Sequence, residues 1–270
     1  MFEITSAMKF YNDDTYQAHV DEETKDNRPK GQEPRNFKTH AVGYCKAIKP
    51  FNLKLIPDTE QQGKLDYFTQ TKSTGADLRD MGKQGTRIPT KNQGQKGYCW
   101  AHSPVTVMQM MRAQMGEPWA DLSAYSVACP IKNFRDEGGW NAQAVGYIAE
   151  NGCATSRTWA QQSMDRSCIQ ASAEERMHFR YVDWLDLDPG EMEQQMITVL
   201  LSGGFLAADF NWWSHSVAVI ALLSISPIIR VLIMNSWGDD WSQAGLGILE
   251  GRHAVPSAAT ALQVAYASAA

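Results

Sequence analysis

The feature that most restricts the fold of this chain is a glycine-rich loop leading directly into an apolar segment. Residues 92–103 read Asn-Gln-Gly-Gln-Lys-Gly-Tyr-Cys-Trp-Ala-His-Ser, and apolar side chains recur at steps of three and four through residue 115. This period predicts a helix with one buried face, beginning close to Cys99. The unpaired N–H groups and positive dipole at a helix N-terminus stabilise an anion. We therefore expect a reactive Cys99 thiolate with a lowered pKa.

Three neighbours of Cys99 bear on this interpretation. Gln93 lies six positions earlier, across a turn with two glycines, so its amide can face a carbonyl oxygen on which Cys99 drives negative charge. His102 would share a helix face with Cys99, but no side chain that would orient it is evident, and we interpret it as a packing residue. Pro104 lacks a backbone N–H, so it should kink the helix or delay its start.

The second half of the chain adds two polar motifs to an apolar region. Residues 213–219 read Trp-Ser-His-Ser-Val-Ala-Val, and residues 235–238 read Asn-Ser-Trp-Gly. Each polar residue has a structural explanation by itself, since a lone buried cysteine is usually inert and asparagine often serves a turn. Found together, such residues favour an active site. The candidates are Gln93, Cys99, His215 and Asn235.

These motifs resemble those of the papain-like cysteine peptidases, and the resemblance covers roughly residues 77–251. It implies an α+β fold with two lobes: a helical lobe that carries Cys99, and a β-barrel-like lobe that carries His215 and Asn235, with a peptide cleft between them. It also implies that Cys99 is the nucleophile, His215 the base and later the acid, and Asn235 the orienter of the imidazole. Gln93 and the Cys99 backbone N–H would form the oxyanion hole.

The resemblance also implies a substrate-binding loop. Gly138 and Gly139 would let the backbone share strand-like hydrogen bonds with an extended peptide, although a glycine pair is by itself typical of an ordinary turn. Trp140 would form the wall of an apolar pocket, and Trp237 would shield the hydrogen bond of the catalytic imidazole from water. Between residues 209 and 215 the chain is too short for the hairpin that builds one cleft wall in the family.

The five cysteines leave one over after any pairing, as a nucleophilic thiol would. In extracellular members of the family a disulfide joins the segment before the nucleophile to a downstream loop. The two positions here are Lys96 and Asp136, for which we expect a salt bridge instead, and the loss of the disulfide points to a reducing compartment. A second bridge of the family would join Cys129 to Cys168; two unlinked thiols are an equally open alternative.

Residues 1–72 precede the resemblance and are expected to form an N-terminal extension to a peptidase domain at residues 73–270. Charges of both signs with few apolar residues predict an extended or partly disordered segment. The spaced Glu-Arg-Phe-Asn pattern of the family's inhibitory prosegment does not occur in it. We favour an arm that packs on the surface or on another protein. The alternative is an atypical propeptide in which residues 47–56 form a strand across the cleft.

Regular patterns predict further elements downstream. Strands are expected at residues 205–209, 215–224 and 228–234, where β-branched and other apolar residues predominate. A helix is expected at residues 141–151, ending before Gly152.

The composition argues against several classes of function. A formal net charge of −5 without a basic stripe gives no electrostatic reason for a nucleic acid partner. The N-terminus lacks the pattern of a secretory signal, which favours an intracellular or virion-associated protein. The apolar residues 216–234 are interrupted by Pro227 and Arg230, so we expect two buried strands and no membrane span. No His or Cys residues have the short spacings of zinc ligands, and we expect no cofactor.

We conclude from the sequence that a cysteine-type endopeptidase, acting through an acyl-enzyme, is the favoured function. The rival hypothesis is a structural or assembly protein of virion type that uses the same fold to hold a partner segment, with little or no catalysis. The missing prosegment pattern, the short cleft wall, the polar arm and Tyr98 beside the nucleophile motivate this alternative. A transglutaminase or deubiquitinase is less favoured, because the Asn-Ser-Trp-Gly motif resembles the papain group specifically.

Overall fold

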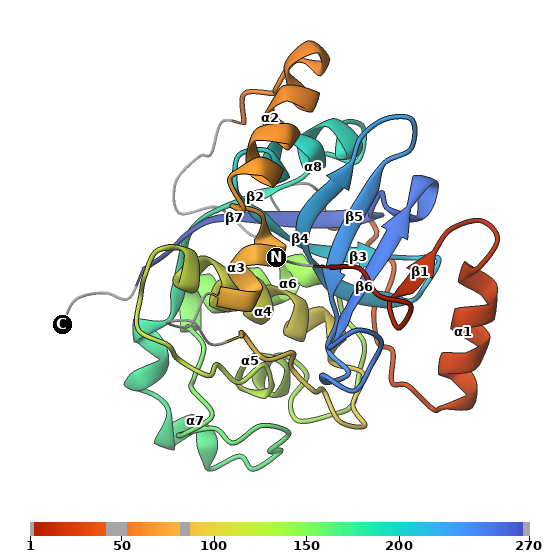
Figure 1. Ribbon diagram of the computed structural model, residues 1–270. Helices are drawn as coiled ribbons and strands as arrows, with labels where there is room; N and C mark the ends of the chain where they lie inside the picture. Colours follow the sequence, from red (N-terminus) through yellow and green to blue (C-terminus); the bar gives the residue numbers. More distant parts are fainter. Residues whose placement is uncertain (1–2, 42–52, 82–86, 267–270) are drawn as a thin grey trace.

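The computed structural model describes residues 3–41, 53–81 and 87–266, which form one sheet with helices on both faces (Figure 1). The helices are α1 (Tyr16–Lys25), α2 (Asp58–Gln70), α3 (Gly75–Met81), α4 (Cys99–Gln114), α5 (Tyr125–Ile131), α6 (Asn141–Asn151), α7 (Cys168–Ala171) and α8 (Met192–Leu200), with short 3₁₀ turns η1 (Glu175–His178) and η2 (Gly251–His253). The strands are β1 (Lys9–Tyr11), β2 (Arg180–Asp186), β3 (Phe205–Phe210), β4 (His215–Ser224), β5 (Arg230–Met234), β6 (Leu246–Glu250) and β7 (Ala258–Tyr266).

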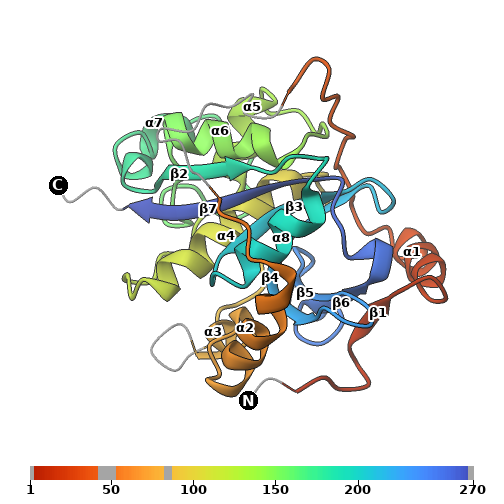
Figure 2. The same ribbon diagram turned by 90° about the horizontal axis from the view of Figure 1, so that it is seen from above.

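The sheet divides the molecule into two apolar clusters. Its strand order is β1-β6-β5-β4-β3-β7-β2, and every neighbouring pair is antiparallel except β1 with β6. Because side chains alternate across a strand, Phe205 and Ala207 of β3 pack toward α4, α5 and α6, whereas Leu206 and Ala208 pack toward α8 and α2. Figure 2 shows α5, α6 and α7 gathered on one side, with α1 beside β1 at the opposite edge.

Helix α4 is the centre of the helical half. It begins at Cys99 and is buried over most of its length, so the predicted helix is confirmed. Pro104 lies inside it and does not delay its start. The predicted helix at residues 141–151 is also confirmed as α6, and it ends at Gly152, whose φ of 75° favours glycine.

The apolar stretch of the second half forms strands, as predicted. β3, β4 and β5 lie within one residue or two of their expected bounds. The pairing of β4 with β5 is antiparallel, and it returns the chain from His215 to Asn235 at the same end of the sheet. No helix within residues 3–41, 53–81 and 87–266 has both the length and the apolar character needed to cross a bilayer.

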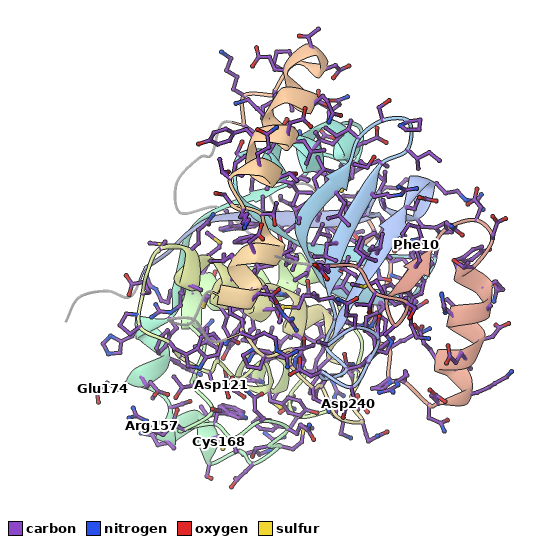
Figure 3. The ribbon with its side chains drawn as sticks, in the orientation of Figure 1. Phe10, Asp121, Arg157, Cys168, Glu174 and Asp240 are labelled. Carbon is purple, nitrogen blue, oxygen red and sulfur yellow. The ribbon has the colours of Figure 1, made fainter. Side chains whose placement is uncertain are left out.

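The expectation that residues 1–72 are extended or partly disordered is wrong for their described part. β1 pairs with β6 at the sheet edge, α1 follows it, and α2 packs near β4. Figure 3 marks Phe10 on β1, and the next residue, Tyr11, is fully buried. The extension has few apolar residues, but some of them, such as Tyr11, Ile56 and Leu65, enter the core, which a count of composition does not reveal.

The predicted inhibitory strand at residues 47–56 is not found where it can be assessed. Residues 47–52 lie outside the described residues. Residues 53–56 form no strand, and the Ile56 N–H donates to Thr198 Oγ1 of α8 at 3.1 Å. This part of the chain is therefore held by α8, on the sheet face opposite α4.

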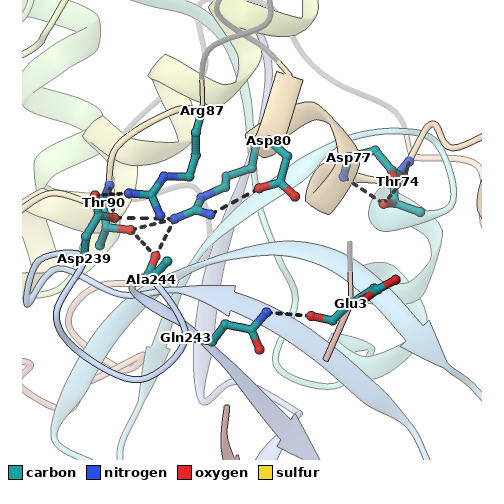
Figure 4. A network of polar contacts seen from close by, with 10 residues as sticks. Glu3, Thr74, Asp77, Asp80, Arg87, Thr90, Asp239, Gln243 and Ala244 are labelled. Atoms are coloured by element: carbon teal, nitrogen blue, oxygen red, sulfur yellow. Dashed lines mark hydrogen bonds and ion pairs between the residues drawn. The ribbon is translucent and has the colours of Figure 1, made fainter. Parts of the chain in front are cut away.

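A polar network joins the two loops that flank the candidate site (Figure 4). The Arg79 guanidinium donates to the Ala244 carbonyl, and the Thr90 N–H donates to Asp239 Oδ1 at 3.1 Å. Arg87 pairs with the same carboxylate at 2.6 Å. Because Thr90 leads toward Gln93 and Asp239 follows the Asn-Ser-Trp-Gly motif, this network fixes one loop relative to the other.

Candidate active site

Cys99 is the first residue of α4, and the packing of α4 on β3 and β4 places its thiol beside the sheet. The thiol is fully buried, within hydrogen-bond reach of the backbone N–H groups of Ser216 and Gly31. Burial raises the pKa of the Cys99 thiol to about 11, although both N–H donors oppose this shift. The expected lowered pKa is therefore wrong for this arrangement, because a segment of the chain covers the thiol and the lost hydration outweighs the helix N-terminus.

His215 and Asn235 meet because they lie at neighbouring ends of β4 and β5. Asn235 Oδ1 lies 2.7 Å from His215 Nε2 and accepts a hydrogen bond from the Nε2–H, which leaves Nδ1 as the basic nitrogen. Nδ1 is buried and has no hydrogen-bond partner in the described part of the chain. Burial lowers the pKa of His215 to about 3, so the imidazole is neutral here. Ser216, which follows His215 in β4, places its backbone N–H against the Cys99 thiol, and Nδ1 of the imidazole makes no hydrogen bond to that thiol.

Trp237 lies against the imidazole, and its part in shielding the His215–Asn235 hydrogen bond from water stays a prediction. Its ring stacks on that of His215 with centroids 4.3 Å apart and an interplanar angle of 24°. Trp213 approaches the same imidazole at 5.0 Å and 66°. Two indoles therefore confine His215 while Asn235 holds one of its nitrogens.

Gln93 presents its amide to a peptide carbonyl. Its backbone N–H donates to the Ser236 carbonyl at 2.8 Å, and its Oε1 accepts the Ser236 hydroxyl at 2.5 Å. These bonds orient the amide nitrogen, which donates to the Lys96 carbonyl at 2.8 Å and to the Pro29 carbonyl at 3.1 Å. The Gln93 amide therefore points at a carbonyl of the N-terminal extension, that of Pro29, and its part in an oxyanion hole stays a prediction.

Residues 29–33 of the N-terminal extension lie across this group. The Gly139 N–H donates to the Gly31 carbonyl at 2.9 Å, and the Glu33 N–H donates to the Gly139 carbonyl at 2.8 Å. Together these bonds form a parallel bridge between Gln32 and Gly139. The strand-like hydrogen bonds expected at Gly139 are therefore made by the chain's own arm.

The fit of this arm depends on glycine. A Cβ on Gly31 would lie 1.9 Å from the Gly97 carbonyl oxygen, and a Cβ on Gly138 would lie 2.7 Å from the Glu33 side chain. The sequence favoured an arm packed on the surface or on another protein, with residues 47–56 across the cleft as the alternative, and neither hypothesis identified residues 29–33. The available signal was Pro29-Lys30-Gly31, an extended proline followed by a glycine that permits close backbone approach.

Trp140 lies against the N-terminal extension in this structure. Its ring lies 4.8 Å from that of His40, a residue of the extension. The side chain expected to wall a substrate pocket is therefore covered by the arm, and its role in substrate binding stays a prediction.

The cysteines outside the site that the structure describes, Cys129, Cys153 and Cys168, are free thiols. The disulfide between Cys129 and Cys168 is wrong, because Cys129 Sγ lies 3.5 Å from Met164 Sδ and Cys168 Sγ lies 3.8 Å from Ser163 Oγ. Figure 3 marks Cys168 in the helical half.

The salt bridge expected in place of the family's other disulfide is confirmed. Lys96 Nζ lies 3.5 Å from Asp136 Oδ2, and both side chains are more than a third exposed. An exposed pair of this kind contributes only ~0–1 kcal/mol.

Asp209 is a buried carboxyl beside the site that sequence reasoning missed. It accepts the Ser216 hydroxyl and, at 3.0 Å, the Asn141 N–H. Burial raises the pKa of Asp209 to about 7, and its charge would raise the pKa of the Cys99 thiol. The signal was an aspartate inside an otherwise apolar strand, Phe205–Phe210.

His102 is fully buried, with neither ring nitrogen hydrogen-bonded, which agrees with a packing residue. Burial lowers the pKa of His102 to about 3. Within the described ranges, no group of three or more His, Cys, Asp or Glu side chains is placed to hold a metal ion.

A helical half that begins its central helix with a buried cysteine, set against a sheet that carries a His–Asn pair, defines the papain class of folds. The model of the papain family of cysteine proteases matches residues 73–219, just over half of the chain. The chain therefore belongs to the papain family of cysteine proteases.

Named relatives agree with this assignment at low identity. Cathepsin K of Mus musculus is 22% identical over 222 residues, covering 74% of this chain and 68% of the relative. Papain of Carica papaya is 26% identical over 190 residues, covering 62% of this chain and 52% of the relative. The chain thus spans about half to two thirds of the length of these relatives.

Solved structures show the same fold over more of the chain. The procathepsin L 3 of Tenebrio molitor has a TM-score of 0.57 at 17% identity, covering 93% of this chain and 79% of that one. The proCathepsin B of Trypanosoma congolense has a TM-score of 0.58 at 14% identity, covering 89% of each chain. Identities this low support the shared α+β papain-like fold alone.

Proposed function

We propose that this protein is a cysteine-type endopeptidase with Cys99 as its nucleophile. His215 Nδ1 takes the thiol proton, the sulfur attacks the substrate carbonyl carbon, and the resulting imidazolium protonates the leaving amine. Water then hydrolyses the thioester, with the imidazole again acting as base. Asn235 keeps the other ring nitrogen protonated, and Gln93 with the Cys99 backbone N–H stabilises the oxyanion.

The observation that carries this proposal is the extended polypeptide backbone in the cleft. Gly139 makes two backbone hydrogen bonds with residues 31–33, and the Gln93 amide meets the Pro29 carbonyl. A cleft that pairs with a backbone in this way recognises polypeptide independently of most side chains. The thiol lies at the middle of this segment, beside Gly31.

We also propose that residues 29–33 block the cleft without being cut. The Cys99 sulfur accepts a hydrogen bond from the N–H of Gly31, and the buried thiol, whose pKa is raised to about 11, is a poor nucleophile while the segment is docked. The solved neighbours are, by their names, pro-forms of cathepsins, which supports a covered resting state. We keep the proposed division into an N-terminal extension at residues 1–72 and a peptidase domain at residues 73–270, and we assign the blocking role to part of the extension.

The test is hydrolysis of an unfolded polypeptide by the full chain carrying Gly31→Ala, a substitution that opposes the docked arm. We expect Cys99→Ala in this background to lower the rate at least ~10³-fold, because the nucleophile is lost. The matched control is Cys168→Ala, which removes a partly exposed thiol outside the site and should leave the rate unchanged. Equal rates with and without Cys99 would reject the peptidase assignment.

Two observations favour the alternative of a structural or assembly protein. The cleft already holds residues 29–33 of the chain, and the covered Cys99 thiol is neutral. A peptide electrophile distinguishes the two functions. If Cys99 of the Gly31→Ala protein is labelled at neutral pH much faster than free cysteine, the thiol is activated and the result supports the enzyme. Labelling no faster than free cysteine would support a segment-binding protein.

A further inference from the structure

The carboxylate of Glu23, on α1, is buried at the junction between the N-terminal extension and the β-rich lobe. It is 1% exposed. Its oxygens accept the Tyr11 hydroxyl and, at 2.7 Å, the Trp213 indole N–H. Lys30 Nζ lies 3.1 Å from Glu23 Oε2 and provides the counter-charge. One side chain of the extension thus joins β1, the start of the cleft segment and the loop before His215.

This carboxylate is connected to the imidazole through aromatic rings. The Tyr11 and Trp213 centroids are 4.8 Å apart, and Trp213 lies 5.0 Å from His215. Trp237 lies on His215 at 4.3 Å. The Trp213 indole is held at its nitrogen by Glu23 and therefore cannot rotate away from the imidazole without breaking a buried hydrogen bond.

The same part of the extension is built into the sheet. Lys9, Phe10 and Tyr11 pair in register with Gly247, Ile248 and Leu249. The Lys9 N–H donates to Ser242 Oγ at 2.7 Å, and Tyr11 is fully buried. Removing residues 3–28 would expose β6 as a free edge and uncover Trp213. The loss of these buried contacts would destabilise the remaining domain, which is not expected of a segment that serves only as an inhibitor.

We propose that residues 3–28 are a permanent part of the enzyme, and that Glu23 is a positioning residue that holds His215 through Trp213. Only the segment that follows, residues 29–33, acts as the displaceable cover of the cleft. This inference rests on the proposed function for its catalytic meaning. It differs from the inhibitory prosegment implied by the resemblance, because the first part of the extension stays in place when the cleft opens.

The charged groups around Glu23 and His215 bear on how the loss of the Glu23 carboxylate would change the imidazole as a base. Glu23 faces Tyr11 and Lys30, with Glu22 and His19 near it on α1. His215 faces Lys30 and, more distantly, His102, in addition to the neutral Asn235. Burial and, to a smaller extent, Lys30 lower the pKa of His215 while residues 29–33 are docked, and Glu23 is the carboxylate paired with Lys30. Once that segment has left, Glu23 acts on His215 through the Trp213 indole, so without Glu23 the imidazole loses its fixed position and accepts the thiol proton less readily.

The experiment compares Glu23→Gln with Glu22→Gln in the full chain carrying Gly31→Ala, so that the segment paired with Glu23 through Lys30 no longer limits access to Cys99. The readout is the rate at which iodoacetamide alkylates Cys99, measured by mass spectrometry at pH 6.5 and pH 10 and normalised to Cys168. Glu22 is the neighbouring carboxylate on α1 and pairs with Lys9 at the surface, so Glu22→Gln should match the Gly31→Ala parent at both pH values. Glu23→Gln should lower the rate roughly fivefold at pH 6.5 and less than twofold at pH 10, where the thiolate forms without the imidazole.

An equal rate for Glu23→Gln and the Gly31→Ala parent at pH 6.5, or an equal fall at both pH values, would overturn the positioning role. Trp213→Phe keeps a ring but removes the N–H that Glu23 accepts, and it should reproduce the fall at pH 6.5. Because alkylation needs no peptide hydrolysis, this outcome is independent of the endopeptidase test.

The permanence of residues 3–28 has a separate test that needs no substitution. Lys38 is exposed, so brief trypsin treatment of the full chain should cut after it. We expect the N-terminal fragment to co-elute with the remainder in gel filtration and to separate only in denaturant. A fragment that separates under native conditions would show that the extension is removable.

Discussion

At the residue scale, burial decides the charge of each titratable group beside the cleft. The pKa of the Cys99 thiol is raised to about 11 and that of His215 is lowered to about 3, in both cases chiefly by lost hydration. Asp209 follows the same rule, with a pKa raised to about 7. While residues 29–33 cover the cleft, the thiol and imidazole are therefore both neutral. The thiolate and imidazolium expected from the sequence need the cleft to be hydrated.

Asp209 should make the stability of the protein fall with rising pH. Its folded pKa of about 7 lies above the ordinary value of 3.8, so folding favours the protonated acid. The destabilisation is absent below pH 3.8, grows as the pH rises toward about 7, and is constant above it. Asp209→Asn removes this dependence of the unfolding free energy on pH, because an amide does not ionise. The amide can still donate to Ser216 Oγ and accept from the Asn141 N–H. We expect the variant to gain about 2–4 kcal/mol in unfolding free energy at pH 8.

Urea denaturation of wild type and Asp209→Asn at pH 4, 6 and 8 measures this effect. Asp165→Asn, at a fully exposed carboxyl, should follow the wild-type dependence between pH 4 and pH 8. If the stability difference between Asp209→Asn and wild type does not change with pH, Asp209 is ionised throughout.

At the element scale, the sequence predicts those parts that local pattern determines. α4 and α6 follow from helical periodicity and from Gly152, and β3 to β5 follow from runs of apolar residues. β1 and α1 could not be predicted, because their place depends on contacts with β6 and Trp213 far along the chain. Among the candidate site residues, Gln93 and Asn235 were found by motif, whereas Asp209 and the cleft segment depend on tertiary packing.

The cleft segment should be released by a single methyl group. Gly31→Ala would place a Cβ against the Gly97 carbonyl oxygen, which is backbone and cannot turn aside. We expect alkylation of Cys99 at neutral pH to become at least ~10-fold faster as the thiol regains hydration. Gly63→Ala is the matched control, because a Cβ there meets nothing within 4 Å. Equal rates for the two variants would mean that the arm does not limit access.

At the scale of the whole molecule, a buried ion pair ties the extension to the sheet. Arg35 donates to both oxygens of Asp186 at 2.7 Å, and their side chains are 1% and 3% exposed. The same guanidinium also donates to the carbonyls of His40 and Ala41. The chain is therefore anchored on either side of the cleft segment, by Glu23 before it and by Arg35 after it.

Breaking this anchor should cost far more than breaking an exposed pair. Arg35→Gln leaves the buried Asp186 carboxylate without its guanidinium, and we expect a loss of ~3–5 kcal/mol in unfolding free energy. Lys96→Gln breaks the half-exposed pair with Asp136 and should cost only ~0–1 kcal/mol. Urea denaturation of both variants tests the comparison, and losses of similar size would contradict it.

The parallel pairing of β1 with β6 has a consequence for how the molecule is made. Asn12 and Glu250, joined beside these strands, are 238 positions apart in the sequence. A ribosome therefore releases the first strand long before its partner exists, and closing so distant a contact is slow. Until it closes, the newly made chain carries an open β6 edge that other chains can join, so synthesis is the stage at which this protein is most exposed to aggregation.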